Sequence, residues 1–209
     1  CASATDALNL ALKGLLEQGD HVLISAMEHN SVLRPLRGLQ RERGIHLEII
    51  PCDSAGRLDP DEVVRRMNNT TRLVVVSHAS NVTGTVQPAT AIGEHVRQRG
   101  AYFLLDAAQT AGLLPLDMQA MHIDLLAFSG HKGLFGLQGT GVLIVGERIK
   151  SLRPWREGGT GFNSLAQEQP QDWPERFEAG TPNVPGILSL NEGLAFLEKE
   201  GLTAVRDKE

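Results

Sequence analysis

The chain has 209 residues, 41% of them hydrophobic, which suits one large α/β domain or two small ones. Its net charge of −5 gives no reason to expect nucleic acid or an anionic membrane as a partner, and no apolar run approaches the roughly 20 residues that a membrane span requires. Two cysteines are too few for a disulfide framework or a metal cluster, so we expect a cytoplasmic protein without a metal site.

The two ends of the sequence are unusual for a complete protein. The first residue is Cys1 rather than methionine, and it stands close to a predicted helix start. The last residues lie within charged sequence of helical character. We therefore expect this chain to be a piece of a longer protein.

Helical and apolar segments alternate along the chain. Helices are predicted at 5–18, 31–43, from 59 onward, and at 91–99 and 185–200, with short apolar strands at 21–25, 46–50, 73–76, 102–105, 124–128 and 139–145. The strands are almost continuously apolar, which is typical of a parallel sheet covered by helices on both faces. Residues 153–174, with three prolines and three glycines and no sustained period, predict a long surface loop.

Polar residues follow the ends of four predicted strands. They are His29, Asn81, Asp106 with Gln109, and Ser129 with Lys132. In open parallel sheets the carboxyl ends of the strands meet at one edge, and ligands bind in the crevice outside it. The sequence therefore predicts one crevice that collects these side chains.

Lys132 differs from the other four lysines because it lies between an apolar strand and a glycine-rich loop. Burial penalises the charged form of an amine, and an amine with a lowered pKa is what Schiff-base chemistry needs. The alternative is a structural lysine at a strand end that extends its amine to solvent.

A small-residue turn, 2–5, precedes the first predicted helix. Free N–H groups and the positive end of the helix dipole make such a start a candidate anion site, to which Thr5, Ser129 and His131 would contribute. The alternative is that Thr5 only caps the helix.

Together these groups suit a ligand that carries a phosphate, an aromatic ring nitrogen and an aldehyde. Asp106 would pair with the protonated ring nitrogen, and His29 would stack on the ring. Gln109 or Asn81 would hydrogen-bond a phenolic oxygen, and Lys132 would form the Schiff base. An acid beside the ring nitrogen and a lysine at the aldehyde are the protein groups that make pyridoxal 5'-phosphate an electron sink.

Six segments in order along nearly the whole chain resemble successive motifs of the class V aminotransferases, most closely the cysteine desulfurase and selenocysteine lyase group. They are 4–9, 28–29, 80–84, 106–109, the Ser-Gly-His-Lys of 129–132, and 177–183. The resemblance implies the large domain of fold-type I pyridoxal-phosphate enzymes, an α/β fold on a mostly parallel seven-stranded sheet. Residues 1–183 would form this domain, 153–183 would reach toward a dimer partner, and 184–209 would lead to a small domain outside the chain.

The resemblance also implies roles for individual residues. Lys132, His29 and Asp106 would be catalytic. The cofactor-binding set would be Ala4, Thr5, His29, Asn81, Asp106, Ala108, Gln109, Ser129, His131, Lys132 and Thr181. Thr181 would contact the phosphate of the neighbouring subunit's cofactor, so the active protein would be a homodimer.

The chain departs from the family pattern at several points. The family's sulfur-accepting cysteine and carboxylate-binding arginine would lie C-terminal to these residues, and neither Cys1 nor Cys52 matches that cysteine. Gly-Gly-Thr at 158–160 replaces a commoner triple glycine, and Leu-Gln at 137–138 replaces a proline-containing turn. These differences indicate a divergent subgroup.

The function expected from the resemblance is a pyridoxal-phosphate enzyme acting on a small amino acid, L-cysteine or selenocysteine, with a sulfur-acceptor protein as a possible partner. This chain alone is expected not to desulfurate cysteine. Transamination or epimerisation on the same cofactor, and a non-catalytic cofactor-binding or dimerisation module, stay open. A dinucleotide site is disfavoured because no G-x-G-x-x-G follows a predicted strand.

Overall fold

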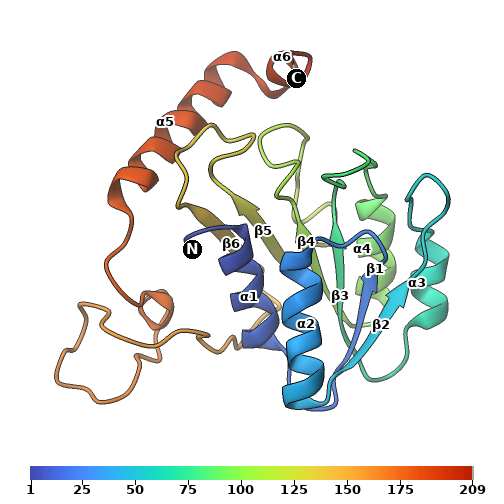
Figure 1. Cartoon of the computed structure of the whole chain (residues 1–209), viewed down its shortest axis with the longest axis horizontal. Coiled ribbons are helices and arrows are strands. Elements are labelled where there is room, and N and C mark those ends of the chain that lie inside the picture. Colours follow the sequence, from blue (N-terminus) through green and yellow to red (C-terminus); the bar gives the residue numbers. More distant parts are fainter. Residues whose placement is uncertain (209) are drawn as a thin grey trace.

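The computed structural model describes residues 1–208, and a twisted six-stranded sheet lies at its centre (Figure 1). The strand order is β2-β1-β3-β4-β5-β6. The strands are β1 (His21–Ser25), β2 (His46–Ile50), β3 (Thr71–Ser77), β4 (Tyr102–Asp106), β5 (Leu125–Ser129) and β6 (Gly141–Val145). The helices are α1 (Ala4–Leu15), α2 (Asn30–Arg43), α3 (Pro60–Arg66), α4 (Ala89–Gln98), α5 (Val184–Glu200) and α6 (Leu202–Arg206).

Two apolar cores fill the two faces of the sheet. On one face α1 and α2 pack over side chains such as Ile24 and Val75, and on the other α3 and α4 pack over Val74 and Phe103. Successive strand residues alternate between the two cores, because side chains along a strand point to opposite faces. The almost continuously apolar strands are thus explained by burial on both sides, and the predicted α/β fold is confirmed.

Five strands are parallel, and only β6 runs antiparallel, against β5. The resemblance implied seven strands, whereas the described residues form six. β2 and β6 are the two edge strands of the sheet. On the open side of β6, the N–H of its first residue, Gly141, donates a hydrogen bond to the Cys1 carbonyl (2.7 Å). No other described strand is available to extend the sheet at either edge.

The direction in which successive strands are added to the sheet reverses between β1 and β3. From β1 the chain crosses through α2 to β2 on one side, and from β2 it returns through α3 to β3 on the other. In open α/β sheets the crevice outside the strand ends at such a switch point is the usual ligand position. Residues that follow β1, β3, β4 and β5 are therefore placed around one opening.

The C-terminal third leaves the sheet. Residues 153–174 form the predicted long loop, which ends at a short 3-10 turn, η1 (Glu175–Phe177), and α5 then runs along the outside (Figure 1). Arg156 ties the loop to α1 through an ion pair with the buried Asp6, with 2.9 Å between Nη2 and Oδ2. None of the described helices combines the length and the apolar character that crossing a bilayer requires.

Candidate active site

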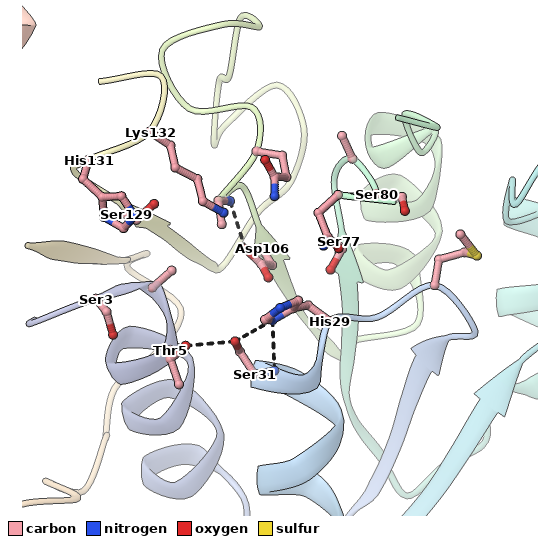
Figure 2. A pocket seen from close by; sticks show the side chains of 16 residues that line it. Ser3, Thr5, His29, Ser31, Ser77, Ser80, Asp106, Ser129, His131 and Lys132 are labelled. Carbon is pink, nitrogen blue, oxygen red and sulfur yellow. Dashed lines mark hydrogen bonds between the residues drawn. The ribbon is translucent and has the colours of Figure 1, made fainter. Parts of the chain in front are cut away.

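A pocket of about 240 Å³ opens outside the carboxyl ends of β1, β3, β4 and β5 (Figure 2). It brings together ten of the eleven residues that the sequence singled out: Ala4, Thr5, His29, Asn81, Asp106, Ala108, Gln109, Ser129, His131 and Lys132. The eleventh, Thr181, lies exposed in the segment before α5 and does not line this pocket. Ala4 and Lys132, which are 128 positions apart in the chain, thus share one cavity.

Asp106 forms the floor of the pocket. It is the last residue of β4, it is 5% exposed, and its Oδ1 accepts a hydrogen bond from Ala108 N–H (2.9 Å). Burial raises the pKa of Asp106, while the Ala108 bond and the positive charges of His29 and Lys132 act in the opposite direction. No described cation forms an ion pair with this carboxylate. A cationic group bound above it would therefore relieve an uncompensated buried charge.

His29 stands across the pocket from Lys132, with Asp106 between them in the view of Figure 2. It is the N-cap of α2, and its Nδ1 accepts a hydrogen bond from Ser31 N–H (3.1 Å). Ser31 Oγ lies 2.7 Å from the same nitrogen and 2.9 Å from Thr5 Oγ1. The imidazole is thus oriented by two helix starts, α1 and α2, and its ring face stays available to the pocket.

The opposite end of the pocket offers hydroxyl and backbone donors. Ser3 rather than Thr5 caps α1, since its side chain accepts from Asp6 N–H (3.1 Å). Ser129, 3% exposed at the end of β5, has a hydroxyl with no hydrogen-bond partner among the described residues. A buried, unpartnered hydroxyl is uncommon and costly, so this one is well suited to a ligand oxygen.

The exposure of Lys132 differs from what the sequence predicted. Its side chain is exposed, so the described residues do not desolvate the amine as its place in the sequence predicted. The reason is geometric: β5 ends at Ser129, and the chain then turns outward along the rim, where Gly130 N–H donates to the Thr140 carbonyl (3.0 Å). From this rim the side chain extends into the pocket opening toward Asp106 (Figure 2). Any desolvation must come from what fills or covers the pocket.

Asn81 and Gln109 complete the wall near Asp106. Asn81 is exposed in the turn after β3, and Gln109 is half-buried in the turn after β4. Neither side chain has a hydrogen bond to another described residue, although both line the pocket. Their amides are therefore free to bind a ligand.

The Aminotransferase class-V family model matches residues 1–209. The chain belongs to the class V aminotransferase family. Among class V relatives, a probable cysteine desulfurase of Pyrococcus abyssi is 35% identical over 213 residues, which cover 99% of this chain and 53% of the relative. The chain thus spans about half the length of the curated relatives it matches.

Solved structures agree with this class V assignment. The apo structure of a cysteine desulfurase from Thermococcus onnurineus has a TM-score of 0.89 and 35% sequence identity, with 97% of this chain and 52% of that chain covered. The structure of SspA in complex with cysteine has a TM-score of 0.79 and 30% identity, with 93% and 53% covered. The fold of this chain is therefore that of about half of a cysteine desulfurase.

Sequence reasoning missed part of this class V pocket. The additional lining residues are Ser3, Met27, Ser31, Ser77, Ala79 and Ser80. Ser31 had a local signal, since serine is frequent at helix starts and a helix was predicted from residue 31. Ser77 had none, since only the pairing of β3 with β4 places it beside Asp106.

Glu28 lies just outside this set, between β1 and His29. Its carboxylate accepts hydrogen bonds from Ser25 Oγ, Ser77 N–H and Ser77 Oγ. Burial raises the pKa of Glu28 to about 7, and the nearby charge of Asp106 adds to that rise, while the serine bonds oppose it. This class V protein therefore has one acid in the pocket, Asp106, and one just outside it, Glu28, and the pKa values of both are raised.

These two acids predict an unusual pH dependence of stability without cofactor. An acid whose folded pKa exceeds its unfolded value binds protons more tightly when folded, so the free energy of unfolding falls as pH rises from about 4.5 to about 7. For Glu28 that fall amounts to about 3 kcal/mol at about 1.4 kcal/mol per pH unit. Urea unfolding across this range should show a shallower fall in Glu28→Gln than in wild type. Exposed Glu94→Gln is the matched control, and parallel wild-type and Glu28→Gln profiles would contradict the assignment.

Proposed function

We propose that this chain binds pyridoxal 5'-phosphate and forms the cofactor-binding part of a cysteine desulfurase-type enzyme acting on L-cysteine or selenocysteine. The observation that carries this proposal is the juxtaposition in one pocket of Asp106, Lys132 and Ser129: a buried carboxylate, together with a lysine amine and a buried hydroxyl that have no partner among the described residues. Each of these side chains is available to bind a ligand. The carboxylate, the amine and the hydroxyl suit the ring nitrogen, the aldehyde and the phosphate, respectively, of one molecule.

The residues present fit this cofactor at each of its polar groups. Asp106 would hold the proton on the ring nitrogen, because an uncompensated buried carboxylate stabilises a cation beside it. The Ser129 hydroxyl, with the α1 N-terminus, would donate to the phosphate. Asn81 and Gln109 would donate to the phenolic oxygen with amides that have no described partner.

Lys132 has two roles in this proposal. Its Nζ extends into the opening, where it would hold the cofactor at its aldehyde and would be placed to take and return the proton of the substrate Cα. The bound cofactor supplies the electron sink for the charge that develops at Cα. His29 would pack against the ring from the α2 side, held by Ser31.

The substrate proposal is supported by the relatives called cysteine desulfurase and by the structure of SspA in complex with cysteine. In the proposed reaction cysteine and an acceptor thiol yield alanine and a persulfide, so the sulfur and its proton balance. Neither Cys1 nor Cys52 lines the pocket, and burial raises the pKa of the Cys52 thiol. No arginine among the described residues lines it either. The acceptor thiol and the carboxylate-binding arginine would come from residues elsewhere, including a small domain after residue 209.

The proposal extends to a homodimer in which Thr181 approaches the partner's cofactor. Thr181 is exposed and outside its own chain's pocket, and the start of α5 that follows it exposes Val184, Ile187 and Leu188. An apolar patch of this kind is typical of a protein–protein contact. Residues 153–183 would then reach toward the partner, and 184–209 would lead on from the large domain.

The test is product analysis with the full-length protein and L-cysteine. Alanine and acceptor-bound sulfur in equal amounts, above the background of free pyridoxal phosphate, are expected. An oxo acid in place of alanine would indicate transamination, and D-cysteine would indicate epimerisation. A protein that does not bind pyridoxal phosphate would refute the whole proposal.

His29→Ala is expected to weaken pyridoxal-phosphate binding about three- to ten-fold, the range of a lost aromatic stacking contact, and to change the visible absorbance of the bound cofactor. The fold should survive, because the ring is exposed and the loss of this N-cap costs only about 1 kcal/mol. Equilibrium dialysis measures the affinity. His46→Ala, on the edge strand β2, is the control, and wild-type affinity in His29→Ala would make His29 a structural residue only.

A further inference from the structure

The carboxylate of Glu28 bridges the ends of two neighbouring strands. Its Oε1 accepts from Ser25 Oγ at the end of β1 (2.5 Å) and from Ser77 N–H at the end of β3 (2.9 Å), and its Oε2 accepts from Ser77 Oγ (3.0 Å). Ser25 Oγ also accepts from Met27 N–H (3.2 Å). Three donors thus converge on one side chain, and the turn between β1 and α2 is closed on itself.

This bridge lies between the two groups that flank the proposed ring position. The residue after Glu28 is His29, so the backbone that the bridge holds also sets where the imidazole stands. On the other side, Ser77 is the register partner of Asp106 across β3 and β4. A shift at Glu28 would therefore separate His29 from Asp106, although Glu28 does not itself line the pocket.

We propose, on the basis of the proposed function, that Glu28 is a positioning residue: its carboxyl group clamps the end of β1 to the end of β3 and thereby holds the His29 imidazole in place at the proposed ring position, near Asp106. The clamp acts through His29. The bonds span 49 residues of sequence and fix a turn that has no other side-chain tie to β3 among the described residues.

The clamp depends on the length of the Glu28 side chain rather than on its charge. Burial raises the pKa of Glu28 to about 7, so the group is partly protonated near neutrality, and the two serine hydroxyls can turn to donate or accept as needed. The charged or titratable groups that face it are Asp106 on β4, Cys52 after β2 and the adjacent His29. Gln has the reach to keep all three contacts, with its amide donating to Ser77 Oγ, whereas Asp keeps the charge but is one methylene shorter.

Three variants separate these possibilities: Glu28→Gln, Glu28→Asp and Glu28→Ala, with Glu94→Gln, at an exposed position of α4, as the control. We expect pyridoxal-phosphate affinity within about three-fold of wild type for Glu28→Gln and about ten-fold weaker for Glu28→Asp and Glu28→Ala, since both leave Ser77 N–H without its acceptor. The circular dichroism of the bound cofactor should change with the affinity. In a His29→Ala background, Glu28→Ala should add no further loss.

Other outcomes overturn the clamp. Wild-type affinity in Glu28→Ala, or a loss that persists undiminished in the His29→Ala background, would show that Glu28 does not act through His29. Wild-type binding by Glu28→Asp with a loss in Glu28→Gln would assign the effect to charge. Should Glu28→Ala fail to fold, the Gln and Asp variants still decide between reach and charge.

A second measurement does not depend on the cofactor. The NMR chemical shift of the His29 ring in the cofactor-free protein should change in Glu28→Asp and stay near wild type in Glu28→Gln and Glu94→Gln. An unchanged His29 resonance in Glu28→Asp would overturn the clamp. If the wild-type protein binds no pyridoxal phosphate, the proposed function fails, while this shift still reports whether Glu28 positions His29.

Discussion

Replacing Lys132 with alanine is expected to abolish covalent attachment of pyridoxal phosphate and to reduce turnover of the full-length enzyme by at least about 10³-fold, within the range for loss of a general acid–base group. The amine is the one lysine nitrogen that reaches the pocket among the described residues, since Lys13, Lys150, Lys199 and Lys208 lie outside it. The effect is large because one side chain would both hold the cofactor and carry the Cα proton. The fold should be unaffected, because Lys132 is exposed.

Borohydride reduction followed by peptide mapping locates the attachment directly. In the wild-type protein the pyridoxyl label should fall on Lys132, and Lys132→Ala should remain unlabelled after the same treatment. Lys150→Ala, at another exposed lysine, should be labelled like wild type. A label on any other lysine while Lys132 stays free would refute the assignment.

Asp106→Asn is expected to keep the cofactor bound while lowering the rate of Cα proton exchange about 100-fold or more, a magnitude similar to the loss of one preorganised electrostatic contact in other active sites. Asn preserves the side-chain shape and can still accept from Ala108 N–H, but it carries no charge to hold the proton on the ring nitrogen. Deuterium exchange at Cα of a slow substrate such as alanine measures this. The control is Asp117→Asn, an exposed acid in the turn before β5, and wild-type exchange in Asp106→Asn would exclude the role.

The same substitution should make the cofactor-free protein more stable at neutral pH. Burial raises the pKa of Asp106, so ionisation above the unfolded pKa costs folding free energy, and Asn removes that cost. Urea unfolding at pH 7 should therefore show a higher midpoint for Asp106→Asn than for wild type, with the gain shrinking as pH falls toward the ordinary pKa of an aspartate. A gain in stability together with a loss of function is the pattern expected of a residue kept for its chemistry. An equal or lower midpoint would show that the buried carboxylate is compensated in the folded protein.

The local features of this chain follow from its sequence. Strand segments such as 73–76 are apolar throughout, and Asp59 with Pro60 marks the start of α3 as cap and first residue. Such signals depend on neighbours in the chain, because helix capping and side-chain periodicity are short-range properties. The polar residues after four strands were sufficient to predict one crevice, since parallel strands present their carboxyl ends at the same edge.

Only the tertiary structure decided which of those side chains are buried and what they touch. Ser129 is enclosed and has no hydrogen-bond partner within residues 1–208, while Lys132, three residues later, is exposed on the rim, although both lie at the end of the same apolar strand. Glu28 meets Ser77 only because β1 and β3 are neighbours in the sheet. The antiparallel direction of β6 was likewise absent from the local pattern. Burial and long-range hydrogen bonds are set by segments far apart in the chain, and desolvation, which raises the pKa values of Glu28 and Asp106, arises only when those segments pack together.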